Sequence, residues 1–111
     1  MKYQGVWNGE IIAEADETEI LQIEGNIYFH PDKVKKEFLE PSNTHTTCPW
    51  KGEASYYNLL VNGMKNEDAA WYYPNPKDGS TQIVSNSNNN KFGGDFSNFI
   101  AFWRGVEVKA L

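Results

Sequence analysis

Two Asn-Gly pairs constrain the fold of this 111-residue chain more than any other feature of its sequence. Asn8-Gly9 and Asn62-Gly63 each stand between runs that are rich in apolar residues. A two-residue hairpin turn needs positive φ at both central positions, and Asn followed by Gly adopts that backbone with little strain. The sequence therefore predicts two antiparallel hairpins, which pair residues 2–7 with 10–16 and residues 53–61 with 68–73.

Further strands are predicted on both sides of these hairpins. Residues 19–25 are expected to turn through Gly25 and Asn26 into a strand at 27–30, and strands at 98–103 and 106–110 close the chain. Aromatic residues make up 14% of the chain, and their side chains favour strands. Because strands do not alternate with helices, a parallel doubly wound sheet is not expected. We predict a mainly β fold of antiparallel sheets with one short α-helix.

The helix is predicted at "PDKVKKEFLE", residues 31–40. Its first two residues, Pro and Asp, suit a helix start, Val34 and Phe38 stand four apart on one face, and Pro41 ends the segment. The polar stretch 85–98 is predicted to be a long loop because it is rich in Asn, Ser and Gly. Whether this loop acts as a lid is left open by the sequence.

Charge and cysteine content limit the classes of function. The formal net charge of -5 repels phosphate backbones, so nucleic acid is not an expected partner. A single cysteine, Cys48, forms no intrachain disulfide, which agrees with a cytoplasmic location. The sequence contains neither an apolar run of membrane-spanning length nor a signal-like start, so no membrane association is expected.

Five motifs run in order from residue 7 to residue 103. They are "WNGEIIAEA", "IYF", "SNTHTTCPWKGEASYY", "DAAWYYPNP" and "IAFW". This ordered set resembles the DUF427 family, a group of small domains without an established activity. The resemblance implies one domain over residues 1–111 and an Mss4-like, or β-tent, arrangement of packed antiparallel sheets. Many relatives on that broad fold carry a structural zinc, and one cysteine cannot supply four thiolate ligands.

The central motif holds the candidate reactive groups. Cys48 is a candidate nucleophile because Lys51 and His45, three residues away on either side, would lower its pKa if they approached it. Lys51 is a second candidate nucleophile. The alternative for Cys48 is a buried, inert thiol that packs as a small hydrophobe. A metal site would have to combine His45 and Cys48 with His30 and Glu53, but the chain lacks HxxxH and CxxC pairs. We therefore expect no metal and no cofactor.

Lys51 and Gly52 are also candidates for ligand binding. A Lys-Gly pair at a strand entry presents an ammonium and an unobstructed backbone N–H to an anion, whereas in the plainer interpretation the lysine stem covers Trp50. The aromatic residues Tyr28, Trp50, Tyr56, Trp71 and Tyr73 are expected to lie mostly in the core, with one or two of them lining a pocket. The predicted ligand-binding set is His45, Lys51, Gly52, Glu53, Tyr56, Trp71 and Tyr28.

We therefore expect a small-molecule binding protein whose pocket lies near Lys51. Two alternatives remain at this point. One is an enzyme that uses Cys48 or Lys51 as its nucleophile. The other is an interaction module, such as a homodimer that pairs an edge strand.

Overall fold

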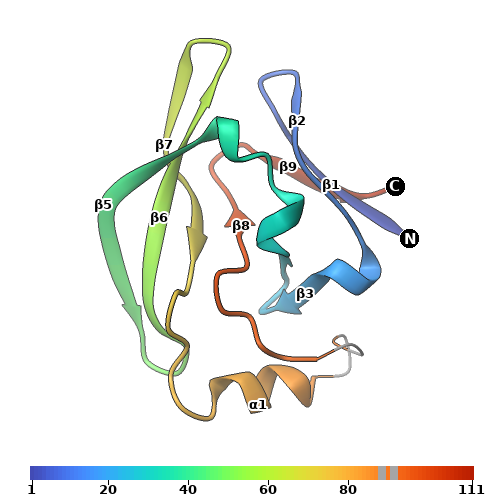
Figure 1. The fold of residues 1–111 in the computed structure, drawn as a ribbon, viewed down its shortest axis with the longest axis vertical. Helices are drawn as coiled ribbons and strands as arrows, with labels where there is room; N and C mark the ends of the chain where they lie inside the picture. Colours follow the sequence, from blue (N-terminus) through green and yellow to red (C-terminus); the bar gives the residue numbers. More distant parts are fainter. Residues whose placement is uncertain (88–89, 91–92) are drawn as a thin grey trace.

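The computed structural model describes residues 1–87, 90 and 93–111 and consists mainly of antiparallel strands (Figure 1). The predicted fold class is therefore confirmed. No helix among the described residues is long and apolar enough to span a bilayer. The strands are β1 (Lys2–Trp7), β2 (Glu10–Asp16), β3 (Ile20–Ile23), β4 (Asn26–Phe29), β5 (Leu39–Cys48), β6 (Gly52–Val61), β7 (Met64–Tyr72), β8 (Ala101–Phe102) and β9 (Glu107–Ala110).

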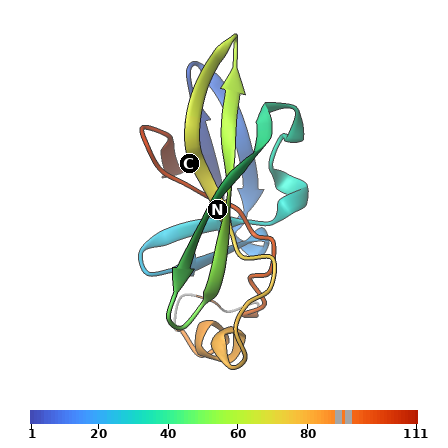
Figure 2. The ribbon, with the colours of Figure 1, turned by 90° about the vertical axis from the view of Figure 1, so that its left-hand side faces the viewer.

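The strands form three antiparallel sheets, with the orders β2-β1-β9, β3-β4 and β5-β6-β7-β8. Figure 2 looks onto the long strands of the third sheet, with the short helix α1 (Ser80–Ser85) at the lower end of the molecule. Among the described residues, one pair connects the second sheet to the third through backbone hydrogen bonds. Phe29 and Ile100 exchange backbone hydrogen bonds of 2.8 and 2.9 Å, which attach β4 to the segment that leads into β8.

Both predicted Asn-Gly hairpins are confirmed, although the return strand of the second, β7, begins at Met64 and not at residue 68. The φ angles are 50° and 77° at Asn8 and Gly9, and 50° and 78° at Asn62 and Gly63. The two hairpin tips lie side by side (Figure 1), where Asn8 Nδ2 donates a 3.0 Å hydrogen bond to Val61 O.

The third hairpin was predicted one residue out of place. Glu24 and Gly25 form its turn, with φ of 53° and 81°, and Asn26 is the first residue of β4. The pairing of Ile23 with Asn26 leaves two turn residues between the strands, so the glycine takes the second position, as it does in the other two turns.

The helix predicted over residues 31–40 is wrong. Two 3₁₀ turns, η2 (Pro31–Lys33) and η3 (Lys36–Phe38), are followed directly by β5. Between the turns the backbone pairs with β2, because Val34 bridges Ala13 and Lys35 N donates to Ile12 O at 2.9 Å. These backbone groups cannot also serve a continuous helix, so tertiary pairing overrides the helical pattern.

The strand β5 was not predicted either. It is polar and contains Pro41, which a central strand does not accommodate. β5 lies at the end of its sheet, and its register shifts between Pro41 and His45, so a proline is tolerated there.

The helix α1 lies just before the predicted loop, of which residues 88–89 and 91–92 fall outside the described part of the chain. Two described residues of that stretch are held in place. Asn90 is buried; its Oδ1 accepts from Gln22 N at 2.7 Å and its Nδ2 donates to Gln22 O at 2.8 Å. Gly94 packs directly against α1, since a Cβ there would lie 2.2 Å from Thr81 O.

Two apolar clusters fill the space between the sheets, and β4 contributes to both. Tyr28 and Phe29 are each fully buried, but successive strand residues point to opposite faces. Phe29 therefore packs with Ile12 and Leu59 in the first cluster, and Tyr28 packs with Phe96 in the second. The second cluster borders the candidate site.

The close approach of Gly94 to α1 predicts that Gly94→Ala destabilises the fold by about 1–3 kcal/mol, because an added methyl must push backbone atoms apart. Urea unfolding measures the change. Gly5→Ala is the control, since the nearest atoms to a Cβ there lie at ordinary contact distances of 3.7 Å and the change should be smaller. Equal losses of stability in the two variants would contradict the prediction.

Candidate functional site

Lys51 is a buried cation that lies beside the second apolar cluster. It is the last residue of the turn between β5 and β6, and only 7% of its side chain is exposed. Its Nζ forms an ion pair with the Glu24 carboxylate on the β3–β4 turn. The same Nζ lies 5.5 Å from the ring centroid of Trp50 and 5.2 Å from that of Tyr73. The ammonium is thus enclosed by one carboxylate and two aromatic rings.

The surroundings of Lys51 keep it charged. Burial by itself lowers the pKa of the ammonium, but the hydrogen bond to Glu24 and the charge interactions with neighbouring tyrosines outweigh it, so the pKa lies above its ordinary 10.5. The hydrogen bond from Lys51 in turn lowers the pKa of the Glu24 carboxyl below 4.5. A nucleophilic lysine needs a lowered pKa. Lys51 is therefore better suited to binding a negative or polar group than to attacking one.

A pocket of about 170 Å³ opens beside this ammonium. Its walls are aromatic, and the ring of Trp71 stands edge-on to that of Trp103, with the centroids 5.8 Å apart. Trp103 is 43% exposed and is the most exposed of the residues that line the pocket. The lining residues are Lys51, Tyr56, Trp71, Tyr73 and Trp103.

Hydrogen bonds fix the orientation of the two tryptophans. Trp71 Nε1 donates to the hydroxyl of the buried Tyr28 at 2.9 Å, and Trp103 Nε1 donates to Asp68 O at 2.6 Å. Burial, followed by the neighbouring Tyr28, raises the pKa of Tyr73 to about 12. Tyr73 lines the pocket as a neutral phenol, a group that can donate a hydrogen bond.

The structure brings four of the predicted ligand-binding residues together. Lys51, Tyr56 and Trp71 line the pocket, and Tyr28 lies behind Trp71. Tyr56 and Trp71 face each other across β6 and β7, so their side chains share one face of the sheet.

His45 and Glu53 belong to the opposite face. His45 pairs with Ser55, and its Nδ1 lies 3.2 Å from Ser55 Oγ and 3.9 Å from Glu53 Oε1. Because side chains alternate along β6, Glu53 and Ser55 point away from the face that carries Tyr56. The Ser and Glu oxygens also approach the same ring nitrogen, so the group lacks the relay geometry of a catalytic triad.

Cys48 and Gly52 lie near the pocket without lining it. Cys48 is half-buried and packs against the second cluster. Gly52 has a φ of 110°, and a Cβ there would lie 3.2 Å from Asn75 O. Because Gly52 has no side chain, the loop after β7 can pack closely against it. That loop is held by a 2.9 Å hydrogen bond from Lys77 N to Lys51 O.

Glu24 and Trp103 were not predicted as site residues. Both reach the site through long-range packing, since Glu24 arrives on the β3–β4 turn and Trp103 follows β8. One local signal for Glu24 was available, because Glu occupies a turn position at which the two other hairpins carry Asn. Tyr73 was named only among the aromatic residues, yet it stands two residues from Trp71 and therefore faces the same side.

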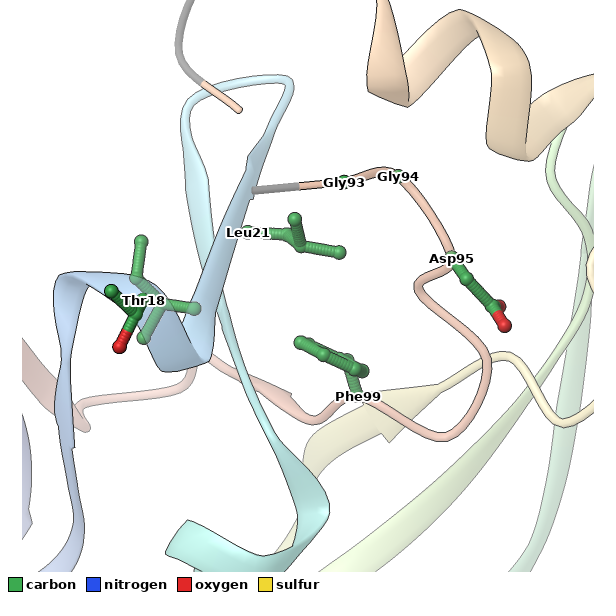
Figure 3. A pocket seen from close by; sticks show the side chains of 7 residues that line it. Thr18, Leu21, Gly93, Gly94, Asp95 and Phe99 are labelled. Carbon is green, nitrogen blue, oxygen red and sulfur yellow. The ribbon is translucent and has the colours of Figure 1, made fainter. Parts of the chain in front are cut away.

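Two other pockets differ in character. One of about 190 Å³ places Leu21 and Phe99 across from each other, while the carboxylate of Asp95 points away from them (Figure 3). That carboxylate accepts hydrogen bonds from Ser97, at 3.1 Å from N and 2.7 Å from Oγ. The other pocket, of about 200 Å³, is bordered by Glu24 and Trp50.

Over residues 1–87, 90 and 93–111, no three His, Cys, Asp or Glu side chains gather closely enough to hold a metal ion.

The ion pair predicts a pH dependence of stability. Because the folded pKa of Glu24 is lowered, its contribution is present above pH 4.5 and is lost as the pH falls through the folded pKa. Glu24→Gln should therefore be less stable than the unsubstituted chain at neutral pH, and the difference should shrink toward zero in acid. Urea unfolding of both proteins from about pH 7 to about pH 3 tests this. A difference that stays constant over that range would exclude the mechanism.

A comparison with family models matches residues 2–88 to a domain of unknown function, DUF427. The match covers well over half of the 111 residues. No curated protein matches this chain significantly.

Proposed function

Since the chain belongs to the DUF427 family, whose activity is not established, we propose from its site geometry that it binds a small planar molecule beside Lys51. The observation that carries the proposal is a buried ammonium at the wall of an aromatic pocket. Burying a charge is unfavourable unless specific partners compensate it, and a fully packed apolar core would need no such cation. The aromatic walls suit a flat apolar body, and Lys51 and Tyr73 supply donors for its acceptor atom.

The enzyme alternative receives less support from the geometry. Lys51 is held as a cation, and Cys48 does not line the pocket. The wall residues are also fixed by their own hydrogen bonds, as Trp71 is by Tyr28. A preformed pocket of this kind is typical of binding sites, in which a few polar groups orient the ligand.

Tyr73→Phe tests the proposal, because it removes one donor from the pocket and keeps the ring. We expect it to weaken binding of planar carbonyl compounds about fivefold to tenfold, as the loss of one hydrogen bond does. A panel of small aromatic amides and carboxylates can be titrated while the Trp71 indole N–H signal is followed by NMR.

Tyr57→Phe is the matched control. Burial, followed by Tyr72, also raises the pKa of Tyr57 to about 12, but this side chain stacks on Tyr72, 4.7 Å between centroids, on the other face of the sheet. It should leave binding unchanged. If no compound in the panel shifts the Trp71 signal, or if both variants weaken binding equally, the proposed site is wrong.

A second candidate function rests on β5. This ten-residue strand stands at the end of its sheet, and its final residues, "THTTC", carry no Lys, Glu or Asp to discourage pairing with another chain. We propose antiparallel pairing of β5 with the same strand of a second copy.

Thr47→Lys tests the dimer, since Thr47 is exposed on β5 and added like charges would repel each other across a two-fold interface. We expect sedimentation velocity to show a concentration-dependent dimer for the unsubstituted chain and a monomer for the variant. Ligand titration should be unaffected, because Thr47 does not line the pocket. A monomer at all concentrations in both proteins would rule out this second function.

A further inference from the structure

The turn that carries Glu24 differs from the two Asn-Gly hairpin turns in the identity of its first residue. The first turn residue has a φ of 50° at Asn8, 50° at Asn62 and 53° at Glu24, so the three backbones are alike. Asn tolerates this left-handed conformation, whereas Glu does so less readily. A strained residue that persists at a pocket points to a functional requirement for its side chain. Here the side chain supplies the carboxylate that meets Lys51.

The two partners of the ion pair are buried to different degrees. The Lys51 side chain is 7% exposed, whereas that of Glu24 is 51% exposed. Glu24 can therefore leave for water with little loss of hydration, but the ammonium cannot follow it. Without Glu24 the site would hold a buried cation that needs another anion.

Space is available for Glu24 to move. It borders the neighbouring pocket of about 200 Å³, which Trp50 also lines, while Lys51 borders the aromatic pocket of about 170 Å³. The bonded pair thus lies between two open spaces, with the carboxylate facing one and the ammonium facing the other. A carboxylate that enters the aromatic pocket can therefore reach the ammonium that Glu24 binds, and can compete with Glu24 for it.

We propose that the ligand of this pocket is a planar carboxylate that takes the place of Glu24 on Lys51, so that Glu24 acts as an exchangeable counter-ion for the empty site. The inference rests on the proposed binding function and names the chemical class of its ligand. Carboxylate exchange conserves the charge around the ammonium, and the aromatic walls receive the flat remainder of the ligand. A neutral ligand would leave the ion pair in place.

Benzoate and benzamide serve as probes, because they share shape and differ in charge. We expect Glu24→Gln to bind benzoate about tenfold more tightly than the unsubstituted chain, since the competing charged hydrogen bond is gone. Benzamide affinity should change by less than about twofold, because benzamide does not compete with Glu24. The NMR signals of the Trp71 and Trp103 indole N–H groups report binding of either probe.

Two further variants serve as controls. Glu24→Asn places at this turn the residue that the other two turns carry, so it removes the carboxylate while relieving the backbone, and it should reproduce the gain in benzoate affinity. Lys51→Met replaces the buried cation by an apolar chain of similar length and should abolish the preference for benzoate over benzamide in the Glu24→Gln background.

The outcomes separate this inference from the binding function on which it rests. If benzamide binds but neither Glu24 variant improves benzoate binding, or if both probes gain equally, the counter-ion role is wrong and the pocket still binds. If neither probe shifts the indole signals in any variant, the ligand class is wrong. If the aromatic panel also fails, the binding site itself is refuted.

Discussion

The backbone pairing between Phe29 and Ile100 is the contact on which the arrangement of this molecule depends. It ties the small β3–β4 sheet to the segment that enters β8, and it fixes which way successive residues of β4 point. Phe29 enters the first apolar cluster, and Tyr28 enters the second. From there Tyr28 accepts the hydrogen bond of Trp71, and the turn at the end of the same hairpin delivers Glu24 to Lys51. One pairing thus sets both the core and the site.

Local turn chemistry made the hairpins predictable, while long-range pairing made much of the rest unpredictable. Asn8-Gly9 and Asn62-Gly63 determine their turns without help from distant residues. The segment after Pro31 has a helical pattern, but its backbone pairs with that of β2. The local sequence does not indicate this long-range pairing. β5 was missed for a related reason, since half-buried positions such as Ser42 and Thr44 carry polar side chains and give the strand no apolar alternation.

The candidate site shows the same division. Tyr56 and Trp71 were predicted from their motifs, and strand pairing places them on one face. His45 and Glu53 come from the same motif as Lys51, yet the two-residue period of a strand sends them to the opposite face. Proximity in sequence is therefore a poor guide to a shared site along strands. Trp103, far away in the sequence, reaches the pocket only because β8 pairs with β7.

Asn90 bonds both backbone groups of Gln22 through one side chain, and in doing so it occupies hydrogen-bonding positions that a further strand would need beside β3. The small sheet is therefore closed at this point, while the four-stranded sheet ends in β5. The two edges consequently differ in their capacity for growth. Strand addition at β5 between two copies consumes the same edge in each, so such an assembly stops at a pair and does not propagate into a filament.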